Sequence, residues 1–314
     1  MTTPPVSVVV PTRNGIATLP DLLDRLRRQR VDAPLEIIAI DSASTDGTAE
    51  LLRARADVLI SIRADAFDHG LTRNAGIARA RGELVVLIVQ DALPASDSWL
   101  AALTAPLLAD PAVAGAFARQ QPRDDASAVT RYYLRRWVAA AETPRSMAIG
   151  SRSAFEALTP MDQFLSCAFD NVCSCIRRSV WEQHPFRSTP IGEDVEWARE
   201  VLLAGHRLMY APDAVVVHSH DRSTRYEFER TYVLHRRLYE LFRLRTIPSM
   251  AALTRAIASS TAIHLRCQRA APERQRTARE LGRALSLAVA WPLGQYLGAL
   301  AAVRGWKPSR SSTV

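Results

Sequence analysis

Short apolar segments alternate with amphipathic segments through the first 120 residues. The runs VSVVV (6–10), LEIIAID (35–41) and ELVVLIVQD (83–91) are almost free of polar residues until they end, a pattern typical of strands buried on both faces of a parallel sheet. Intervening segments such as LPDLLDRLRRQ (19–29) and WLAALTAPLLA (99–109) have apolar residues at helical spacing. The alternation predicts an α/β fold, with a mostly parallel sheet flanked by helices and right-handed crossovers.

The rhythm breaks after about residue 120. A polar stretch extends to residue 163, the segment HRLMYAPDAVVVHSH (206–220) predicts two short strands, and nearly everything from Thr224 onward has a helical pattern. We therefore predict an α/β domain over residues 1–221, built from halves 1–120 and 121–221, and a helical C-terminal region over residues 222–314.

The last helical segment contains 19 consecutive residues without a charge, LSLAVAWPLGQYLGALAAV (285–303). This length just reaches that of a membrane span, but Pro292, Gln295 and two glycines weaken that interpretation. Three placements stay open: the helix spans a membrane, lies on a membrane surface, or packs on the protein or on a second subunit of a homo-oligomer.

Positive charge is concentrated in the C-terminal region. Residues 222–314 carry 17 basic and 5 acidic side chains, whereas residues 1–221 carry 23 basic and 27 acidic ones. This asymmetry indicates an anionic lipid or another polyanion as a partner. The chain lacks a nucleic-acid-binding motif, so we expect no nucleic-acid partner.

The cysteines and the N-terminus predict a reducing compartment. The N-terminal residues lack a basic segment followed by a long apolar stretch, so we expect no signal peptide. The spacing of Cys167, Cys173 and Cys175 does not match the paired spacing of zinc sites, so we interpret these thiols as free and buried. The sequence therefore indicates a cytoplasmic protein.

Polar residues follow the first predicted strand. Pro11, Thr12, Arg13 and Asn14 lead from this strand into a helix, where backbone N–H groups can approach a nucleotide. Neither G-x-G-x-x-G nor G-x-x-x-x-G-K-[ST] is present, which disfavours a dinucleotide-binding Rossmann domain and a P-loop.

Carboxylates end the next two buried runs. Asp41 ends the second run, where an acid can accept hydrogen bonds from a ribose or a base, and Ser44 follows it in a turn. Asp91 ends the run at residues 83–91. Ligands of open α/β sheets bind in the crevice outside these strand ends, so both acids are candidate site residues.

The loop FDHGLTRNAG (67–76) gathers His69, Arg73 and Asn74 before a predicted helix. A guanidinium group is a fork-shaped donor that suits the oxygens of a diphosphate. His69 and Asn74 can orient a donor molecule or metal ligands.

Four ordered motifs together resemble one enzyme family. VSVVVPTRNG, DSASTDGT, HGLTRNAGIARARGELVVLIVQDALP and GEDVEWAREVLLAGHRLMYAPDAVVVHSH resemble the motifs of family 2 inverting glycosyltransferases of the GT-A fold, and the resemblance covers roughly residues 5–221. Within that family, F-x-H-G-x-T-R-N followed by Q-D-A is most similar to bacterial rhamnosyltransferases that use TDP-L-rhamnose. The resemblance implies a GT-A catalytic domain that transfers a sugar from a nucleotide-sugar donor.

The resemblance also implies a cation site. The family's Asp-x-Asp triplet is replaced here by Gln90-Asp91-Ala92, so metal binding passes to Asp91 alone, with Mg²⁺ or Mn²⁺ as the cofactor. His218 is the favoured second ligand, because a histidine after the last strand joins the metal shell in some family members. His220 is the alternative, since it lies on the same face of an extended strand.

The remaining roles also come from the resemblance. Asp194 in GEDVEW is the expected base that removes the proton of the acceptor hydroxyl, with Glu193 beside it. The expected nucleotide-sugar site comprises Pro11, Thr12, Arg13, Asn14, Asp41, Ser44, His69, Arg73, Asn74, Gln90, Asp91 and Glu193.

The expected reaction is transfer of L-rhamnose from TDP-β-L-rhamnose to a hydroxyl of a glycan or a lipid-linked glycan. With a lipid-linked acceptor, the basic C-terminal helices would dock the enzyme on the inner, anionic face of the plasma membrane. The alternatives are a transferase that uses a UDP- or GDP-hexose and a non-catalytic protein that binds sugar nucleotides or polyanions. A nucleotidyltransferase is disfavoured, because PTRNG is not a glycine-rich basic loop.

Overall fold

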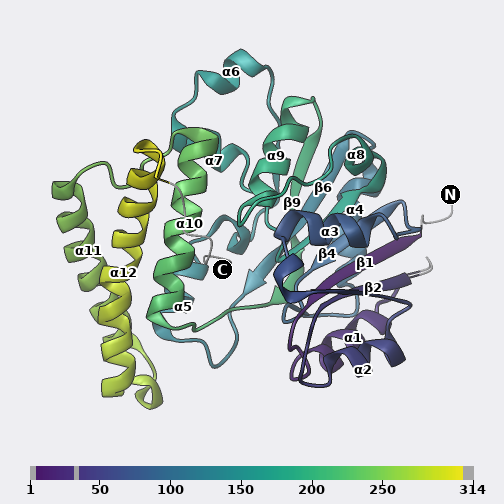
Figure 1. Ribbon diagram of the computed structural model, residues 1–314, viewed down its shortest axis with the longest axis horizontal. Helices are drawn as coiled ribbons and strands as arrows, with labels where there is room; N and C mark the ends of the chain where they lie inside the picture. Colours follow the sequence, from purple (N-terminus) through teal and green to yellow (C-terminus); the bar gives the residue numbers. More distant parts are fainter. Residues whose placement is uncertain (1–4, 32–34, 307–314) are drawn as a thin grey trace.

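A computed structural model describes residues 5–31 and 35–306 of the chain. Its centre is one nine-stranded sheet with the order β3-β2-β1-β4-β8-β6-β9-β5, in which β7 also pairs with β9 (Figure 1). The strands are β1 (Val6–Thr12), β2 (Leu35–Ser42), β3 (Val58–Ile62), β4 (Leu84–Ile88), β5 (Leu93–Pro94), β6 (Val113–Gln121), β7 (Arg145–Met147), β8 (Cys173–Arg177) and β9 (Arg207–Val217).

The N-terminal half forms the predicted parallel sheet, because β1 pairs in parallel with both β2 and β4, and β2 pairs in parallel with β3. Alternate residues of β1 point into two different cores. Val8 and Val10 pack with leucines of α1 (Leu19–Arg27) and α4 (Trp99–Ala109), whereas Val9 packs on the other face with Ile77. This double burial explains why the strands read as unbroken apolar runs. Helices α2 (Thr48–Arg55) and α3 (His69–Ile77) complete this half.

The second half of the sheet contains both parallel and antiparallel strand pairs. Strand β8 is antiparallel to both β4 and β6, and β9 is parallel to β6. The two short strands predicted for residues 206–220 are a single strand, β9, which stays paired with β6 through a register shift beside Ala118. The polar stretch before residue 163 holds short helical turns rather than one loop. The helices of this half are α5 (Ala128–Leu134), α6 (Arg152–Glu156), α7 (Pro160–Ser166), α8 (Arg178–Gln183) and α9 (Glu193–Leu203).

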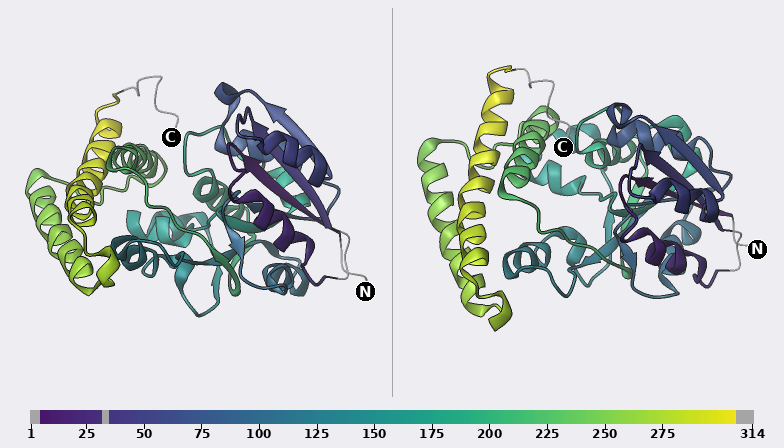
Figure 2. Two further views of the ribbon diagram at one scale, coloured as in Figure 1. Left: turned by 90° about the horizontal axis from the view of Figure 1, so that it is seen from below. Right: turned by 60° about the horizontal axis from the view of Figure 1, so that its bottom comes forward.

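Helices α10 (Thr224–Phe242), α11 (Met250–Ala270) and α12 (Ala278–Val303) lie to one side of the sheet, with α10 nearest to it (Figures 1 and 2). Leu238 and Phe242 of α10 belong to the same hydrophobic core as β1 and α9. The first helix after the predicted boundary at residue 221 is therefore packed into the α/β domain.

The cysteines are free and buried, as predicted.

Helix α12 contains the uncharged segment. By length and composition it could cross a membrane, but 44% of its most apolar window is buried inside the protein. Two glycines allow this packing: a Cβ at Gly298 would overlap the backbone carbonyl of Tyr232 on α10, and one at Gly294 would approach the carbonyl oxygen of Phe228 to 3.0 Å. The glycines that weakened the interpretation as a membrane span are the residues that bring α12 against α10.

Gly298→Ala is expected to destabilise the protein by about 1–3 kcal/mol, because the new methyl group meets backbone atoms that cannot move aside. Gly282→Ala on the same helix is the matched control, since a Cβ there has nothing within 4 Å. This control is expected to be stabilising by about 0.5–1 kcal/mol through helix propensity. Urea unfolding of both variants measures the difference, and equal stabilities would contradict the close packing.

Candidate functional site

The expected nucleotide pocket begins at the carboxyl ends of β1 and β2. Asn14 adopts a left-handed conformation with φ 48°, and its N–H donates to Ser44 Oγ at 2.8 Å. Ser44 Oγ in turn donates to the buried carboxylate of Asp41 at 2.5 Å. Asn14 Oδ1 also accepts the N–H of Thr45 at 2.9 Å. These bonds place three of the predicted donor-binding residues side by side.

Gln90 holds the loop after β1 against the end of β4. Its Oε1 accepts the N–H of Arg13 at 2.9 Å, and its Nε2 donates to the carbonyl of Arg13 at 3.0 Å. A carboxylate could accept the first bond but could not donate the second. A Cβ at Gly15 would come within 2.5 Å of Gln90 Oε1, so this arrangement also requires glycine there. The glutamine in place of the first acid therefore serves a backbone contact.

Asp91, His218 and His220 form a cluster that can hold a metal ion, with one ligand atom of each within 4.8 Å of the others. His220 Nε2 lies 3.2 Å from Asp91 Oδ2, and His218 Nε2 lies 3.7 Å from Asp91 Oδ1. Burial lowers the pKa of His218 to about 4 and also lowers the pKa of His220, so both rings are neutral near pH 7. A neutral imidazole and a carboxylate are the forms that bind divalent cations. Both His218 and His220 are therefore placed to act as metal ligands beside Asp91.

A buried polar chain stands behind His218. His218 Nδ1 lies 3.2 Å from Gln120 Oε1, and Gln120 Nε2 donates to Asp170 Oδ2 at 2.6 Å. Because Gln120 Oε1 can only accept, the network assigns the ring proton of His218 to Nδ1. His218 Nε2 is then free to accept, and it lies 3.1 Å from His220 Nε2 and 3.7 Å from Asp91 Oδ1. Trp137 Nε1 also donates to Asp170 Oδ2, at 3.2 Å.

The guanidinium group of Arg73 lies inside the protein. Its side chain is 6% exposed and forms an ion pair with Glu193 at 3.1 Å, and its Nη1 also donates to the carbonyl of His69 at 2.8 Å. Burial raises the pKa of Glu193, but Arg73 and then His69 outweigh this effect, so the net shift is downward. A direct contact between Arg73 and a diphosphate stays a prediction, and in this structure the charge of Arg73 is matched by Glu193 inside the protein.

Asn74 makes three hydrogen bonds inside the protein. Its Nδ2 donates to the carbonyl of Phe186 at 2.7 Å, while its Oδ1 accepts from Trp181 Nε1 at 2.7 Å and from the N–H of Phe186 at 3.1 Å. The amide thus joins α3 to α8 and to the segment after it. The sequence predicted a loop at residues 67–76, but Asn74 lies inside α3 and its side chain points inward.

Asp194 lies in the first turn of α9, which follows Gly192, and the left-handed φ of 78° at Gly192 makes the turn. Its carboxylate accepts the N–H of Val195 at 2.8 Å and the N–H of Asn171 at 3.3 Å. Burial raises the pKa of Asp194 to about 8, and the neighbouring acids Glu193 and Asp170 add to the shift. A carboxyl group with a pKa near the working pH suits proton transfer, so the predicted role as base is chemically reasonable.

Other residues near the cation site were not predicted. Gln120 and Asp170 support His218, and the guanidinium of Arg123 donates to the Asp91 carbonyl at 2.7 Å. The first two lie in or next to buried strands, and Arg123 lies in a polar loop. None of them has a local sequence signal that points to the site.

Comparisons with known proteins show the family. A family model described as Glycosyl transferase family 2 matches residues 7–183. The O-antigen chain rhamnosyltransferase RfbN of Salmonella typhimurium is 29% identical over 72% of this chain and 70% of its own length. The O-antigen chain rhamnosyltransferase WbaN of Salmonella anatum is 31% identical over 73% of this chain and 70% of its own length.

Solved structures show the same fold. The mannosyltransferase PcManGT from Pyrobaculum calidifontis, in complex with GDP-Man and Mn²⁺, is 22% identical with a TM-score of 0.61, over 98% of this chain and 89% of its own. Glucosyl-3-phosphoglycerate synthase from Mycobacterium tuberculosis, in complex with Mn²⁺, UDP and glucosyl-3-phosphoglycerate, is 18% identical with a TM-score of 0.53, over 79% of this chain and 82% of its own. The fold is therefore GT-A, as expected.

His218→Ala and His220→Ala are each expected to weaken Mn²⁺ binding at least roughly 10-fold, because each removes a nitrogen from the cluster. His206→Ala serves as the control, since His206 contacts His184 instead. Isothermal titration with Mn²⁺ measures the affinities. If His220→Ala binds Mn²⁺ with the affinity of the wild type, His220 is not a metal ligand.

Proposed function

Because the chain belongs to glycosyl transferase family 2, we propose that this glycosyltransferase is an inverting rhamnosyltransferase that uses TDP-β-L-rhamnose. The observation that carries the proposal is the cluster of Asp91, His218 and His220, which lies at the same edge of the sheet as the hydrogen-bonded group of Asp41, Ser44 and Asn14. The two rhamnosyltransferase relatives support the sugar. The motifs HGLTRN and QDA support the same subgroup.

A divalent cation, Mg²⁺ or Mn²⁺, would be held by Asp91, His218 and His220 and would neutralise charge on the leaving nucleoside diphosphate. The donor set of one carboxylate and two imidazoles fits Mn²⁺ better than Mg²⁺, which favours oxygen ligands. Gln120 and Arg123 orient this set through His218 and through the Asp91 carbonyl. The Mn²⁺ in two structural neighbours supports the same choice.

Asp194 would take the proton of the acceptor hydroxyl as that oxygen attacks the anomeric carbon in a single displacement. Inversion of a β-L-rhamnosyl donor then gives an α-L-rhamnoside. Glu193, held ionised by Arg73, keeps a negative charge beside Asp194 and so favours the arrival of a proton there. Asp41, Asn14 and Ser44 would hold the nucleoside, and Pro11, Thr12, Arg13 and His69 complete its surroundings.

A donor screen tests the proposal. Purified enzyme with Mn²⁺ or Mg²⁺ is offered TDP-β-L-rhamnose, UDP-hexoses and GDP-hexoses in separate reactions, and release of the nucleoside diphosphate is measured. Release from TDP-rhamnose alone is the expected result. Turnover of UDP- or GDP-hexoses without turnover of TDP-rhamnose would overturn the rhamnosyl assignment and keep the family.

Asp194→Asn is the matched variant for this screen. It is expected to slow transfer at least roughly 100-fold, because the amide cannot accept the proton, while nucleotide binding is retained. In the wild type kcat/KM should rise with pH up to about 8, since only ionised Asp194 is a base, and then level off. A non-catalytic sugar-nucleotide-binding protein would show neither the turnover nor its loss.

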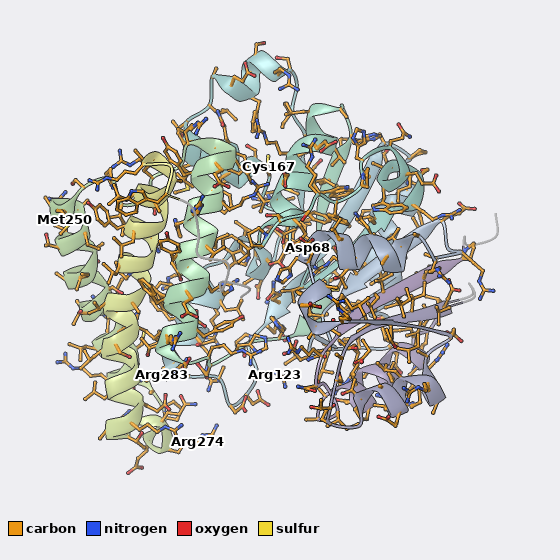
Figure 3. All side chains as sticks on the ribbon, in the orientation of Figure 1. Asp68, Arg123, Cys167, Met250, Arg274 and Arg283 are labelled. Carbon is orange, nitrogen blue, oxygen red and sulfur yellow. The ribbon has the colours of Figure 1, made fainter. Side chains whose placement is uncertain are left out.

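We further propose that the enzyme is cytoplasmic and docks on the inner face of the plasma membrane, where it meets a lipid-linked glycan acceptor. Exposed arginines lie on the connection between α11 and α12 and on the adjoining ends of both helices, and they form no ion pair among the described residues; Arg274 lies within the connection (Figure 3). The exposed apolar side chains of Leu281, Leu285 and Val289 follow at helical spacing on α12. The arginines are Arg266, Arg269, Arg274, Arg276 and Arg279.

The variant Arg266→Gln/Arg269→Gln/Arg274→Gln tests the docking. Each arginine near anionic lipid contributes about 1 kcal/mol, so the variant should partition roughly 100-fold more weakly. Co-sedimentation with phosphatidylglycerol vesicles measures this, with pure phosphatidylcholine vesicles as the control. A variant that lacks residues 222–314 would be uninformative, because it would also lose Leu238 and Phe242, which belong to the hydrophobic core of the α/β domain. Equal sedimentation of wild type and variant would contradict the proposal.

A further inference from the structure

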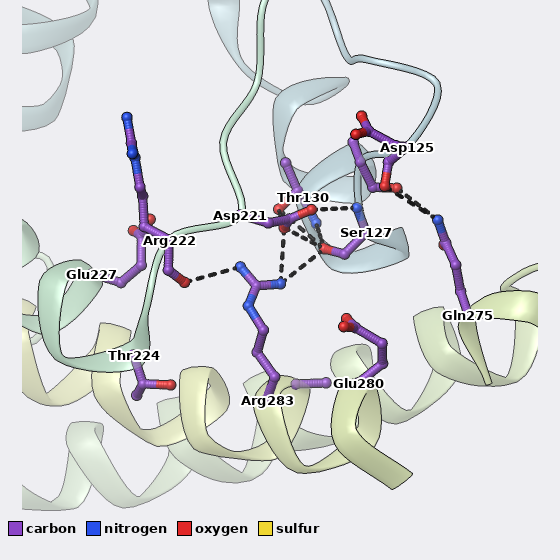
Figure 4. A network of polar contacts seen from close by, with 12 residues as sticks. Asp125, Ser127, Thr130, Asp221, Arg222, Thr224, Glu227, Gln275, Glu280 and Arg283 are labelled. Carbon is purple, nitrogen blue, oxygen red and sulfur yellow. Dashed lines mark hydrogen bonds and ion pairs between the residues drawn. The ribbon is translucent and has the colours of Figure 1, made fainter. Parts of the chain in front are cut away.

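Asp221 follows the second histidine of the cation cluster directly. Its carboxylate accepts the N–H of Ser127 at 2.7 Å, Ser127 Oγ at 2.8 Å and Thr130 Oγ1 at 2.7 Å, and it pairs with Arg283 at 2.8 Å (Figure 4). Residues 218–223 contain no helix or strand. Asp221 is therefore the point at which this irregular segment is fastened after it leaves β9.

Arg283 reaches Asp221 from α12. Its Nη1 also donates to Ser127 Oγ at 3.3 Å, and its Nη2 donates to the carbonyl of Arg222 at 3.3 Å. One guanidinium thus holds both the segment before α5 and the segment after β9. The side chains of Arg283 and Asp221 are only 19% and 32% exposed, so water competes weakly for the pair. Just before α12, Gln275 Nε2 donates to the carbonyl of Ala126 at 3.1 Å and strengthens the same attachment.

The other end of the segment is fastened to the site itself. The N–H of His218 donates to the carbonyl of Gln121 at 2.8 Å. The N–H of Arg123 donates to Ser219 Oγ at 3.1 Å, while the Arg123 guanidinium holds the carbonyl of Asp91. His218 is thus fixed from the sheet, whereas His220 lies between Ser219 and Asp221 and depends on both attachments.

We propose that Asp221 and Arg283 form a clamp through which the C-terminal helices position His220 in the cation site. The inference rests on the proposed function only in that the cluster binds a divalent cation. It makes α12 a part of the catalytic apparatus, although α12 contributes no ligand. Asp221 and Arg283 are positioning residues, and their loss weakens cation binding while all ligands remain.

The test uses the full chain with Mn²⁺ alone, so that sugar transfer plays no part in the readout. Arg283→Met removes the charge and keeps the length of the side chain, and it is expected to weaken Mn²⁺ binding about 10-fold. Asp221→Asn should have a similar effect, and Arg283→Lys should restore most of the affinity. Arg279→Met is the control, because Arg279 lies one turn earlier on α12, is exposed and forms no ion pair among the described residues.

A second readout separates positioning from general stability. Co²⁺ bound by nitrogen ligands has visible absorption bands, and Arg283→Met should change their shape while circular dichroism stays that of the wild type. Mn²⁺ affinity within twofold of the wild type in folded Arg283→Met and Asp221→Asn would overturn the clamp. If Arg283→Met does not fold, Asp221→Asn decides alone. If the wild-type protein itself does not bind Mn²⁺, the cation site is overturned. This result is distinct from failure of the rhamnosyl assignment, which the donor screen tests.

Discussion

The position of β9 between β6 and β5 is the constraint on which the cation site depends. Val217 is paired with Gln121 on one side and with Leu93 on the other. Asp91 lies two residues before Leu93 and His218 lies one residue after Val217, so these pairings join groups that are 127 positions apart. A slip of one residue would turn His218 to the opposite face of the sheet. The register of β9 with β5 and β6 therefore determines whether Asp91 and His218 lie close together.

Glu193 and Asp194 show how strongly local surroundings decide ionisation. Both carboxyl groups lie at the N-terminus of α9, where the helix dipole favours negative charge on either. Among the residues that the structure describes, Glu193 has a cationic partner, Arg73, whereas Asp194 has none, and the pKa of Glu193 falls below the usual range. Asp194 has backbone N–H donors and two acidic neighbours, and burial dominates its pKa. Two adjacent acids are thereby separated into a permanent charge and a group that exchanges a proton.

Much of the fold could be predicted from the sequence because its signals are local. Buried parallel strands appear as apolar runs, and Asp91 and His218 lie where such strands end. The helix that carries Arg73 and Asn74 begins at His69, within the segment for which the sequence predicted a loop, and their side chains point inward, to Glu193 and Phe186. The register shift that keeps β9 continuous depends on pairing with β6, which the sequence of either strand alone does not reveal.

The two hydrogen bonds between the Gln90 side chain and the Arg13 backbone have an electrostatic consequence for the whole site. Because Gln90 is neutral, the cluster offers one negative charge and two neutral rings to a divalent ion. A site with two carboxylates would cancel the charge of the ion, whereas this one leaves a net charge of about +1. With the proposed cation bound, that remaining charge would attract the diphosphate of the proposed donor, and the attraction would be reciprocal, so each would bind more tightly in the presence of the other. The glutamine that makes the backbone contact with Arg13 would thus couple binding of the cation to binding of the nucleotide sugar.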